Sequence, residues 1–428
     1  MSATKNLDAY VTRRLRIAGG KFIAGRTFDE VMESLRQVYL KPIDALQAEL
    51  LSSLGRFVSF ANYDYVGLGT DPRVRKAAAE AAMEWGVGAE ASRLVGGGRT
   101  IHDLLEREIA AFLGVEDAMT MVSGYMTNAS LIGHILTKND LILVDELSHN
   151  SIIVGTETSH ARIVRFAHND LDHLERLLIE HRHLSKRALI VVEGLYSMDG
   201  DIPDLRRLLE FRNVYDAWLM VDEAHSIGVL GSGGRGISEY FGTDASEIDL
   251  IIGTLSKTFA GSGGFIAGRK HVIEWLRFTL PAFVYSVGLS PVIVAGVREG
   301  LAILQSEAWR TERLRENSRF FLREAQARGL NTGAAIGAGV ICIQFRSAEE
   351  CLHAAELLLN AGYYAPPIAQ IGVPKDRPRI RFFISASHER EDLVGALDCL
   401  EKLRAPRQRA ESLLHLGQES APGPAFPG

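Results

Sequence analysis

Short apolar runs alternate with longer stretches of helical periodicity over the middle of the chain, from about residue 61 to residue 300. The runs are only three or four residues long and uniformly apolar, so we expect strands that are buried on both faces. Strands that alternate with helices are typical of crossover units that feed a parallel sheet. The runs are residues 119–122, 141–144, 189–192, 218–221 and 250–252.

The segment before these runs has a different pattern. Residues 28–54 mix apolar positions three and four apart with charged ones, as amphipathic helices do. We therefore predict an N-terminal helical arm over residues 1–60.

A second α/β pattern follows the central region. A charged amphipathic helix is predicted over 306–330, and apolar runs at 339–343 and 380–384 flank a helical stretch. The end of the chain is rich in Pro and Gly and cannot bury enough apolar surface to stay ordered. The predicted organisation is a large domain over 61–300, a small C-terminal domain over 301–404 and a disordered tail over 405–428.

Charge and composition exclude several classes of protein. Lys and Arg total 47 against 53 for Asp and Glu, so the net charge of -6 provides no basic footprint for nucleic acid. No apolar run approaches the roughly 18 to 20 residues that span a bilayer, and the N-terminus lacks the apolar core of a secretory signal. Cys342, Cys351 and Cys399 are scattered, which indicates a reducing, cytoplasmic location. Neither HExxH nor CxxC occurs, so we expect no metal.

Polar residues follow each apolar run. In open parallel sheets, ligands bind beyond the carboxyl ends of the strands, so these residues are candidates for a common site. Together they supply an anion cradle, an aromatic plane, a carboxylate, an imidazole and a lysine. The segments are Ser123-Gly124-Tyr125, Ser148-His149-Asn150-Ser151, Glu193 to Asp201, Asp222-Glu223-Ala224-His225 and Gly253-Thr254-Leu255-Ser256-Lys257.

A pyridine cofactor with a phosphate and an aldehyde requires this combination. A carboxylate keeps the ring nitrogen protonated, so that the ring accepts electrons, and a lysine binds the aldehyde covalently. Asp222 and Lys257 are the natural pair. The strand ends therefore predict pyridoxal 5'-phosphate.

The same segments, in this order and spacing, resemble the α-oxoamine synthases over about Asp64 to His388. This pyridoxal-phosphate family includes aminooxononanoate synthase, aminoketobutyrate ligase, aminolevulinate synthase and serine palmitoyltransferase. The resemblance implies a fold-type I transferase with a mostly parallel, seven-stranded sheet between helices. It also implies a homodimer with its active site at the interface. The implied reaction condenses a small amino acid with an acyl thioester, on CoA or an acyl-carrier protein, and yields an α-amino ketone, carbon dioxide and the free thiol.

The resemblance also assigns roles to individual residues. Four are implied to be catalytic: Lys257 binds the cofactor and moves the α-proton, Asp222 pairs with the ring nitrogen, His225 contacts the phenolic oxygen, and His149 stacks on the ring. The remaining cofactor-binding residues are implied to be Ser123, Gly124, Tyr125 and Thr254 around the phosphate, Glu193 and Ser197 beside the ring, and Ser286, which reaches the partner's phosphate. The implied substrate-binding residues are Arg381, which binds the amino acid carboxylate, and Tyr63.

Several alternatives remain open at this point. Tyr63 stands where aminooxononanoate synthases carry Asn and serine palmitoyltransferases carry Tyr, which favours the latter. An aminooxononanoate synthase, another fold-type I enzyme such as an aminotransferase or lyase, and a cofactor-less partner subunit are the alternatives. Glu193 could also serve only to orient the loop around Ser197. Serine, alanine and glycine differ by a methyl or a hydroxyl, a difference worth only about 1–3 kcal/mol in a pocket.

Overall fold

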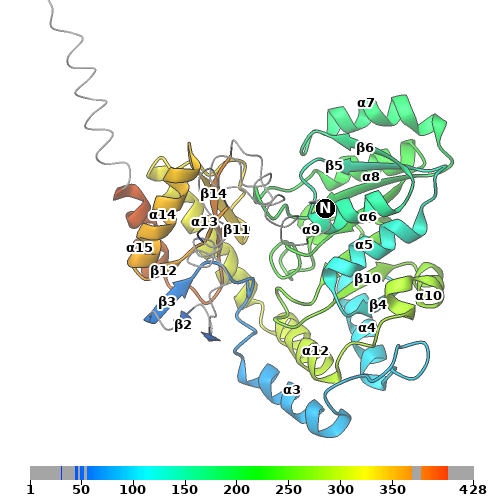
Figure 1. The fold of residues 1–428 in the computed structure, drawn as a ribbon, viewed down its shortest axis with the longest axis horizontal. Helices are drawn as coiled ribbons and strands as arrows, with labels where there is room; N and C mark the ends of the chain where they lie inside the picture. Colours follow the sequence, from blue (N-terminus) through cyan, green and yellow to red (C-terminus); the bar gives the residue numbers. More distant parts are fainter. Residues whose placement is uncertain (1–29, 31–43, 47–48, 53–54, 369–376, 403–428) are drawn as a thin grey trace, which may run out of the picture.

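A seven-stranded sheet forms the centre of the larger domain in the computed structural model, which describes residues 30, 44–46, 49–52, 55–368 and 377–402 (Figure 1). From one edge to the other, the strands are β4 (Asp117–Met121), β10 (Gly264–Gly268), β9 (Leu250–Thr254), β8 (Trp218–Asp222), β7 (Ala188–Glu193), β5 (Leu141–Asp145) and β6 (Arg162–Phe166).

The strand directions bring the polar strand ends to one edge. β9, β8, β7, β5 and β6 are parallel, and β10 is antiparallel to both β9 and β4. β4 therefore runs in the same direction as the parallel strands, and its carboxyl end meets theirs. The mostly parallel sheet expected from the sequence is confirmed, and every predicted apolar run lies on a strand.

Two strands of the seven-stranded sheet were not predicted. β6 lies at the edge of the sheet and is largely exposed, so it has no continuous apolar run. β10 begins and ends with glycine, a residue that is depleted in strands.

Alternating residues of the strands pack into two separate cores. Leu143 and Val192 belong to one core, whereas their neighbours Val144 and Val191 belong to the other. This alternation is why the strands are apolar throughout. The first core is covered by α4 (Thr100–Leu113), α7 (Leu171–His181), α8 (Leu205–Val214) and α12 (Pro291–Ser306), and the second by α5 (Gly124–Ile135), α6 (Asn150–Thr158), α10 (Lys270–Thr279) and α11 (Pro281–Val284).

Shorter elements complete this domain. α3 (Pro72–Trp85) packs on α12. The others are α9 (Ile237–Phe241) and the 3₁₀ turns η3 (Arg182–Leu184) and η4 (Ala245–Glu247).

The small domain has its own apolar core, built around a three-stranded antiparallel sheet in the order β11-β14-β13. Phe321 on its first helix and Phe382 on its central strand are fully buried there, with ring centroids 5.0 Å apart. Its elements are α13 (Trp309–Ala327), β11 (Val340–Gln344), α14 (Ala348–Asn360), β12 (Tyr363–Tyr364), β13 (Pro367–Ile368), β14 (Arg379–Phe383) and α15 (Arg390–Lys402).

The helical character predicted for the N-terminal arm is wrong for its last part. β1 (Asp44–Leu46), β2 (Glu49–Ser52) and β3 (Gly55–Ser59) form an antiparallel ribbon, and β3 pairs in parallel with β12 of the small domain. The ribbon therefore lies beside the C-terminal elements in Figure 1. Strand pairing overrides the helical periodicity here: β1 and β2 pair with each other, and β3 pairs with both β2 and β12. Glu30 is helical, and the rest of the arm up to residue 43 and the predicted tail lie outside the described residues.

A buried ion pair joins the two domains. Arg379 of β14, which is 1% exposed, donates from Nη1 to Oδ1 of Asp199 at 2.7 Å and to the carbonyl of Met198 at 2.9 Å. Asp199 belongs to the loop that follows β7 in the large domain. The small domain is thereby fixed to the loop that also carries Ser197.

Replacing Asp199 with Ala is expected to lower the free energy of unfolding by about 3–5 kcal/mol, because it leaves the buried Arg379 charge without its carboxylate. Urea unfolding followed by circular dichroism measures the change. The matched control is Asp398→Ala, which removes a half-exposed partner of Arg328 and is expected to cost less than about 1 kcal/mol. Equal losses in the two variants would contradict a structural role for the interdomain pair.

Candidate active site

A cavity of about 340 Å³ opens at the carboxyl edge of the sheet, where β4, β7, β8 and β9 end. Its volume lies in the range of small-ligand pockets. Among the residues that line it are most of those singled out in the sequence: Ser123, Gly124, Tyr125, His149, Glu193, Asp222, His225, Thr254 and Lys257.

Three further predicted residues lie next to this group. The ring centroid of Tyr63 is 5.8 Å from Nζ of Lys257. Nη1 of Arg381 donates to the carbonyl of Ser197 at 3.0 Å, and the guanidinium lies over the Phe383 ring. Tyr63, Arg381 and Ser197 therefore extend the site toward the small domain.

Ser286 is not brought to the cavity of its own chain. It lies in the loop after α11, beside Tyr285, whose side chain is 86% exposed. Any role in cofactor binding would have to be exercised in another subunit.

The amino end of α5 forms the anion-binding end of the cavity. Ser123 caps the helix, and its hydroxyl accepts from the backbone N–H of Met126. A side chain at Gly124 would place its Cβ 2.8 Å from Oγ1 of Thr254, so glycine keeps this end of the cavity open. Free N–H groups and the helix dipole favour a phosphate here.

Asp222 supplies a buried negative charge at the end of β8. Its Oδ1 accepts from the backbone N–H of Ala224 at 3.0 Å, and its Oδ2 accepts from Nδ2 of Asn128 at 2.7 Å. These two donors hold the carboxylate in one orientation. A protonated ring nitrogen is a suitable cationic partner for it.

His225 and Lys257, which both line the cavity, are shifted toward their neutral forms. Burial, reinforced by the charges of Lys257 and Arg381, holds the pKa of His225 well below its usual range. Nδ1 of His225 lies 2.7 Å from the hydroxyl of Tyr65. Burial also lowers the pKa of Lys257, against the opposing effect of Asp222. A larger fraction of uncharged amine makes Lys257 a better nucleophile and base.

Burial and a nearby negative charge shift the carboxyl group of Glu193 toward its protonated form. It lies directly opposite Asp222 on the paired strand β7, and its Oε1 accepts from the backbone N–H of His149 at 2.6 Å. Burial, and then repulsion by Asp222, raise the pKa of Glu193 to about 8. The raised pKa lowers the negative charge that Glu193 adds beside Asp222 at neutral pH.

The sequence reasoning gave no role to several residues at the site, among them Asn128, Ser151, Ser256 and Tyr65. Asn128 follows Gly124 by four positions, so helical spacing places both on one face of α5, and this signal could have identified it. Ser151 and Ser256 lie inside the recognised segments. Tyr65 contacts His225 from 160 positions away in the sequence, and no local pattern indicates such a contact.

The residues present fit pyridoxal phosphate. The anion cradle at α5, the carboxylate of Asp222 and the amine of Lys257 line one cavity. In addition, Oδ1 of Asn128 is buried without a hydrogen-bond partner among the described residues, which leaves an acceptor at the same place. Within the described ranges, no group of three or more His, Cys, Asp or Glu side chains could hold a metal ion.

The fold and this cavity define a pyridoxal-phosphate enzyme of fold type I. The family model for class I and II aminotransferases matches residues 56–400. The chain is 36% identical to 8-amino-7-oxononanoate synthase of Fervidobacterium nodosum, over 88% of this chain and 97% of that protein. It is 37% identical to the enzyme of the same name from Thermoanaerobacter pseudethanolicus, over 81% and 87% of the two chains.

Solved structures of serine palmitoyltransferase are also similar. The enzyme from Sphingomonas wittichii superposes with a TM-score of 0.84 at 28% identity, over 92% of this chain and 99% of that chain. The enzyme from S. paucimobilis with a bound PLP–myriocin aldimine gives a TM-score of 0.85 at 26% identity, with the same coverage. The chain belongs to the α-oxoamine synthases, pyridoxal-phosphate-dependent acyltransferases that condense an amino acid with an acyl thioester and release carbon dioxide.

Because the pKa of Glu193 is raised, we expect the free energy of unfolding to depend on pH. Between pH of about 4.5 and about 8, the folded cofactor-free chain keeps a proton that the unfolded chain has released, so Glu193 makes the free energy of unfolding fall as the pH rises through this window. Glu193→Gln keeps the acceptor for His149 but cannot titrate. Urea unfolding at both ends of the window should therefore give a smaller decline for the variant than for the wild type.

The control for this comparison is Glu223→Gln. The pKa of Glu223 is raised to about 7, chiefly by burial, so this variant should remove a separate contribution that ends at lower pH. An unchanged decline in Glu193→Gln would show that Glu193 is ionised in the folded chain.

Proposed function

We propose that the enzyme joins a small amino acid to an acyl thioester in the manner of the 8-amino-7-oxononanoate synthases, with the carbonyl carbon of the acyl group bonded to the α-carbon in place of the lost carboxylate. The single observation that carries this proposal is the convergence of Lys257, Asp222, His149 and the nearby Arg381 at one cavity. The identity of 36–37% to synthases of that name favours this substrate pair over that of serine palmitoyltransferase, whose structures are 26–28% identical. Tyr63 supports the serine palmitoyltransferase reading.

The side chains of the cavity divide the work between binding and proton transfer. When bound, pyridoxal phosphate supplies the electron sink for the reacting α-carbon. The backbone N–H groups at Gly124 and Tyr125, with the hydroxyl of Thr254, hold its phosphate, and Asp222 pairs with its ring nitrogen. Lys257 removes and returns the proton at the α-carbon. The neutral state of His225 suits it to share a hydrogen bond with the phenolic oxygen.

Arg381 binds the carboxylate of the amino acid in this proposal. Its Nη1 is engaged by the carbonyl of Ser197 and by Sδ of Met198, whereas Nε is buried with no hydrogen-bond partner in the described part of the chain. An unpaired guanidinium donor is costly to bury, and a carboxylate would satisfy it. The proximity of Tyr63 to Lys257 makes its ring a wall of the same substrate pocket.

The products named for the relatives determine the substrates to test. An 8-amino-7-oxononanoate skeleton is assembled from alanine and a seven-carbon dicarboxylic acyl group, whereas a serine palmitoyltransferase joins serine to a sixteen-carbon acyl group. The holoenzyme is expected to release carbon dioxide and free thiol with alanine and pimeloyl-CoA or the corresponding carrier-protein thioester. Release with serine and palmitoyl-CoA alone would overturn this choice, and Lys257→Ala should abolish release with every pair.

The homodimer is part of the same proposal, because two joined loops present apolar side chains to solvent. Residues 86–99 and 285–290 are tied by a bond from the N–H of Gly288 to the carbonyl of Ala91, and Val87 and Val95 are 78% and 85% exposed. Exposed apolar patches of this kind mark interaction sites. A second copy of the chain covers the patch, which brings Ser286 toward the partner's phosphate.

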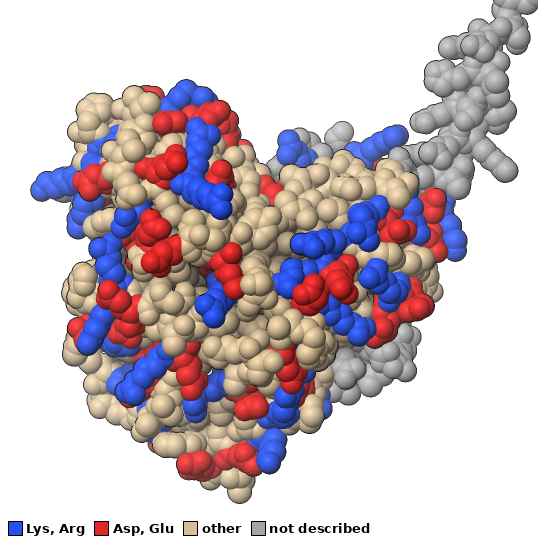
Figure 2. Space-filling view, turned by 180° about the vertical axis from the view of Figure 1, so that it is seen from behind, with Lys and Arg blue, Asp and Glu red and all other residues tan. Residues whose placement is uncertain are grey.

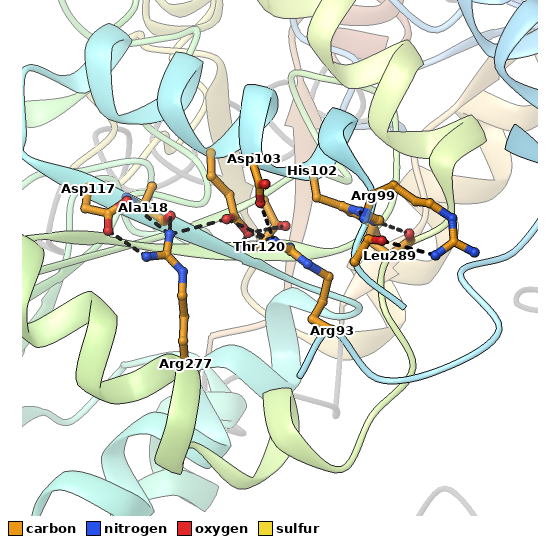
Figure 3. Close-up of polar contacts among 11 residues, drawn as sticks. Arg93, Arg99, His102, Asp103, Asp117, Ala118, Thr120, Arg277 and Leu289 are labelled. Atoms are coloured by element: carbon orange, nitrogen blue, oxygen red, sulfur yellow. Dashed lines mark hydrogen bonds and ion pairs between the residues drawn. The ribbon is translucent and has the colours of Figure 1, made fainter. Parts of the chain in front are cut away.

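Polar contacts from α4 hold these loops in place (Figure 3). Arg93 of the first loop donates to Oε1 of the buried Glu106 at 2.7 Å. His102 lies between the two loops: its Nδ1 accepts from the backbone N–H of Arg99, and its Nε2 lies 2.7 Å from the carbonyl of Leu289. The patch is therefore preorganised for a partner.

Val95→Glu is expected to shift the chain from a dimer toward a 47.0 kDa monomer, because it buries a charge in the proposed interface. Sedimentation equilibrium measures the mass. The control is Val214→Glu at the exposed end of α8, where the same charge should leave the mass unchanged. A wild-type chain that sediments as a monomer would contradict the proposal.

The proposal includes a cytoplasmic location for the protein. In the part of the chain that the structure describes, no helix combines the length and apolarity that crossing a membrane requires. Charged residues of both signs alternate over the face seen in Figure 2. The three cysteines are free. These observations support a cytoplasmic enzyme that acts on small thioester substrates.

A further inference from the structure

The protonation site on His149 is fixed by its neighbours. Nδ1 of its ring lies 3.3 Å from the backbone N–H of Ser151 and 2.7 Å from the Ser151 hydroxyl. A backbone N–H can only donate, so Nδ1 is an acceptor and carries no proton. The proton of the neutral ring is therefore on Nε2.

Asn128 continues this chain of hydrogen bonds to Asp222. Its Nδ2 lies 2.7 Å from Oδ2 of Asp222 and 3.0 Å from Oγ of Ser151. Because an ionised carboxylate only accepts, the amide nitrogen must face Asp222, and its two hydrogens serve Asp222 and Ser151. The Ser151 hydroxyl therefore accepts from Asn128 and donates its own hydrogen to His149.

The chain of bonds is shielded from water and anchored at both ends. Asn128 and Ser151 are 3% and 1% exposed, whereas the His149 ring is open to the cavity. The backbone N–H of His149 is held by Glu193, and the other oxygen of Asp222 by Ala224. Only one set of donor and acceptor assignments uses all the N–H and O–H groups of Asn128 and Ser151 that this network contains.

We propose that Asn128 and Ser151 are positioning residues that connect Asp222 to His149, holding the carboxylate in place and keeping the Nε2 proton of the imidazole directed at the cavity. Neither residue needs to touch the substrate for this purpose. The inference deepens the proposed function and rests on it, since Asp222 and His149 are the residues proposed to contact the cofactor. It assigns the orientation of both to one amide side chain on α5.

The tautomer can be observed without any reaction. In full-length protein with ¹⁵N-labelled histidine, the signals of His149 are identified by their loss in His149→Gln. The wild type is expected to show an unprotonated Nδ1 and a protonated Nε2. In Ser151→Ala the backbone N–H of residue 151 still donates to Nδ1 and keeps the tautomer, but the 2.7 Å bond from the hydroxyl is lost, so the Nδ1 signal should move toward that of an unprotonated nitrogen with a weaker hydrogen bond. The matched control is Ser148→Ala, because the Ser148 hydroxyl is buried without a hydrogen-bond partner in the described ranges.

Asn128→Ala should produce two effects. It should shift the His149 Nδ1 signal less than Ser151→Ala does, because the Ser151 hydroxyl still donates to Nδ1 but is no longer held by Asn128. It should also weaken pyridoxal phosphate binding by about tenfold, because a hydrogen bond to a charged group is lost. Ser151→Ala should change the dissociation constant by less than about twofold, since the bond from Asn128 to Asp222 remains. The double variant should match Asn128→Ala in cofactor affinity and Ser151→Ala in the His149 signals, because the two residues act in series.

Two results would overturn the inference. One is an Nδ1 signal in Ser151→Ala that matches the wild type, and this readout decides alone if Asn128→Ala does not fold. The other is wild-type cofactor affinity in a folded Asn128→Ala. Loss of the proposed condensation activity with the expected tautomers intact would instead reject the proposed substrates and leave the positioning role standing.

Discussion

The buried carboxylate of Asp222 is the charge around which the site is arranged. A negative charge at the end of a buried strand is costly unless hydrogen-bond donors and a cation satisfy it. Asn128 and the backbone of Ala224 supply the donors, and Lys257 lines the same cavity. The pairing of β7 with β8 places Glu193 directly opposite, and burial together with the charge of Asp222 raises the pKa of this carboxyl group to about 8. Each of these residues reaches Asp222 because parallel strands end at one edge.

A feature could be predicted from the sequence where neighbouring residues determine it, and could not be predicted where a distant segment does. The apolar runs at 141–144 and 189–192 identify their strands because burial on both faces requires uniformly apolar residues. The same reasoning places His149, Asp222 and Lys257 together, since each belongs to the polar segment that follows such a run. β3 could not be found in this way, because its partner β12 lies some 300 positions later. Periodicity within residues 28–54 contains no information about that partner.

The same limit applies to the roles of individual side chains. Candidates could be identified by their position after a strand, but the contacts of those candidates could not. Tyr65 reaches His225 from outside every recognised segment, and Asn128 lies three positions beyond the segment that ends at Tyr125. The donor–acceptor direction of a hydrogen bond, which fixes the proton on His149, requires the coordinates of both partners. The residues that make up the site can therefore be predicted largely from local sequence, whereas the contacts between them depend on the tertiary structure.

The two arginines of β14 show how binding and structure are joined in one strand. Arg379 and Arg381 are two positions apart and project from the same face. The first is buried against Asp199, and the second donates to the carbonyl of Ser197, so both engage the loop that follows β7. A substrate carboxylate at Arg381 would thus be placed relative to Lys257 by strand register and a buried ion pair, with little freedom left to the side chain. Arg381 and the cofactor residues come from different domains. The distance between them therefore depends on the contact of Arg379 and Arg381 with the loop that follows β7.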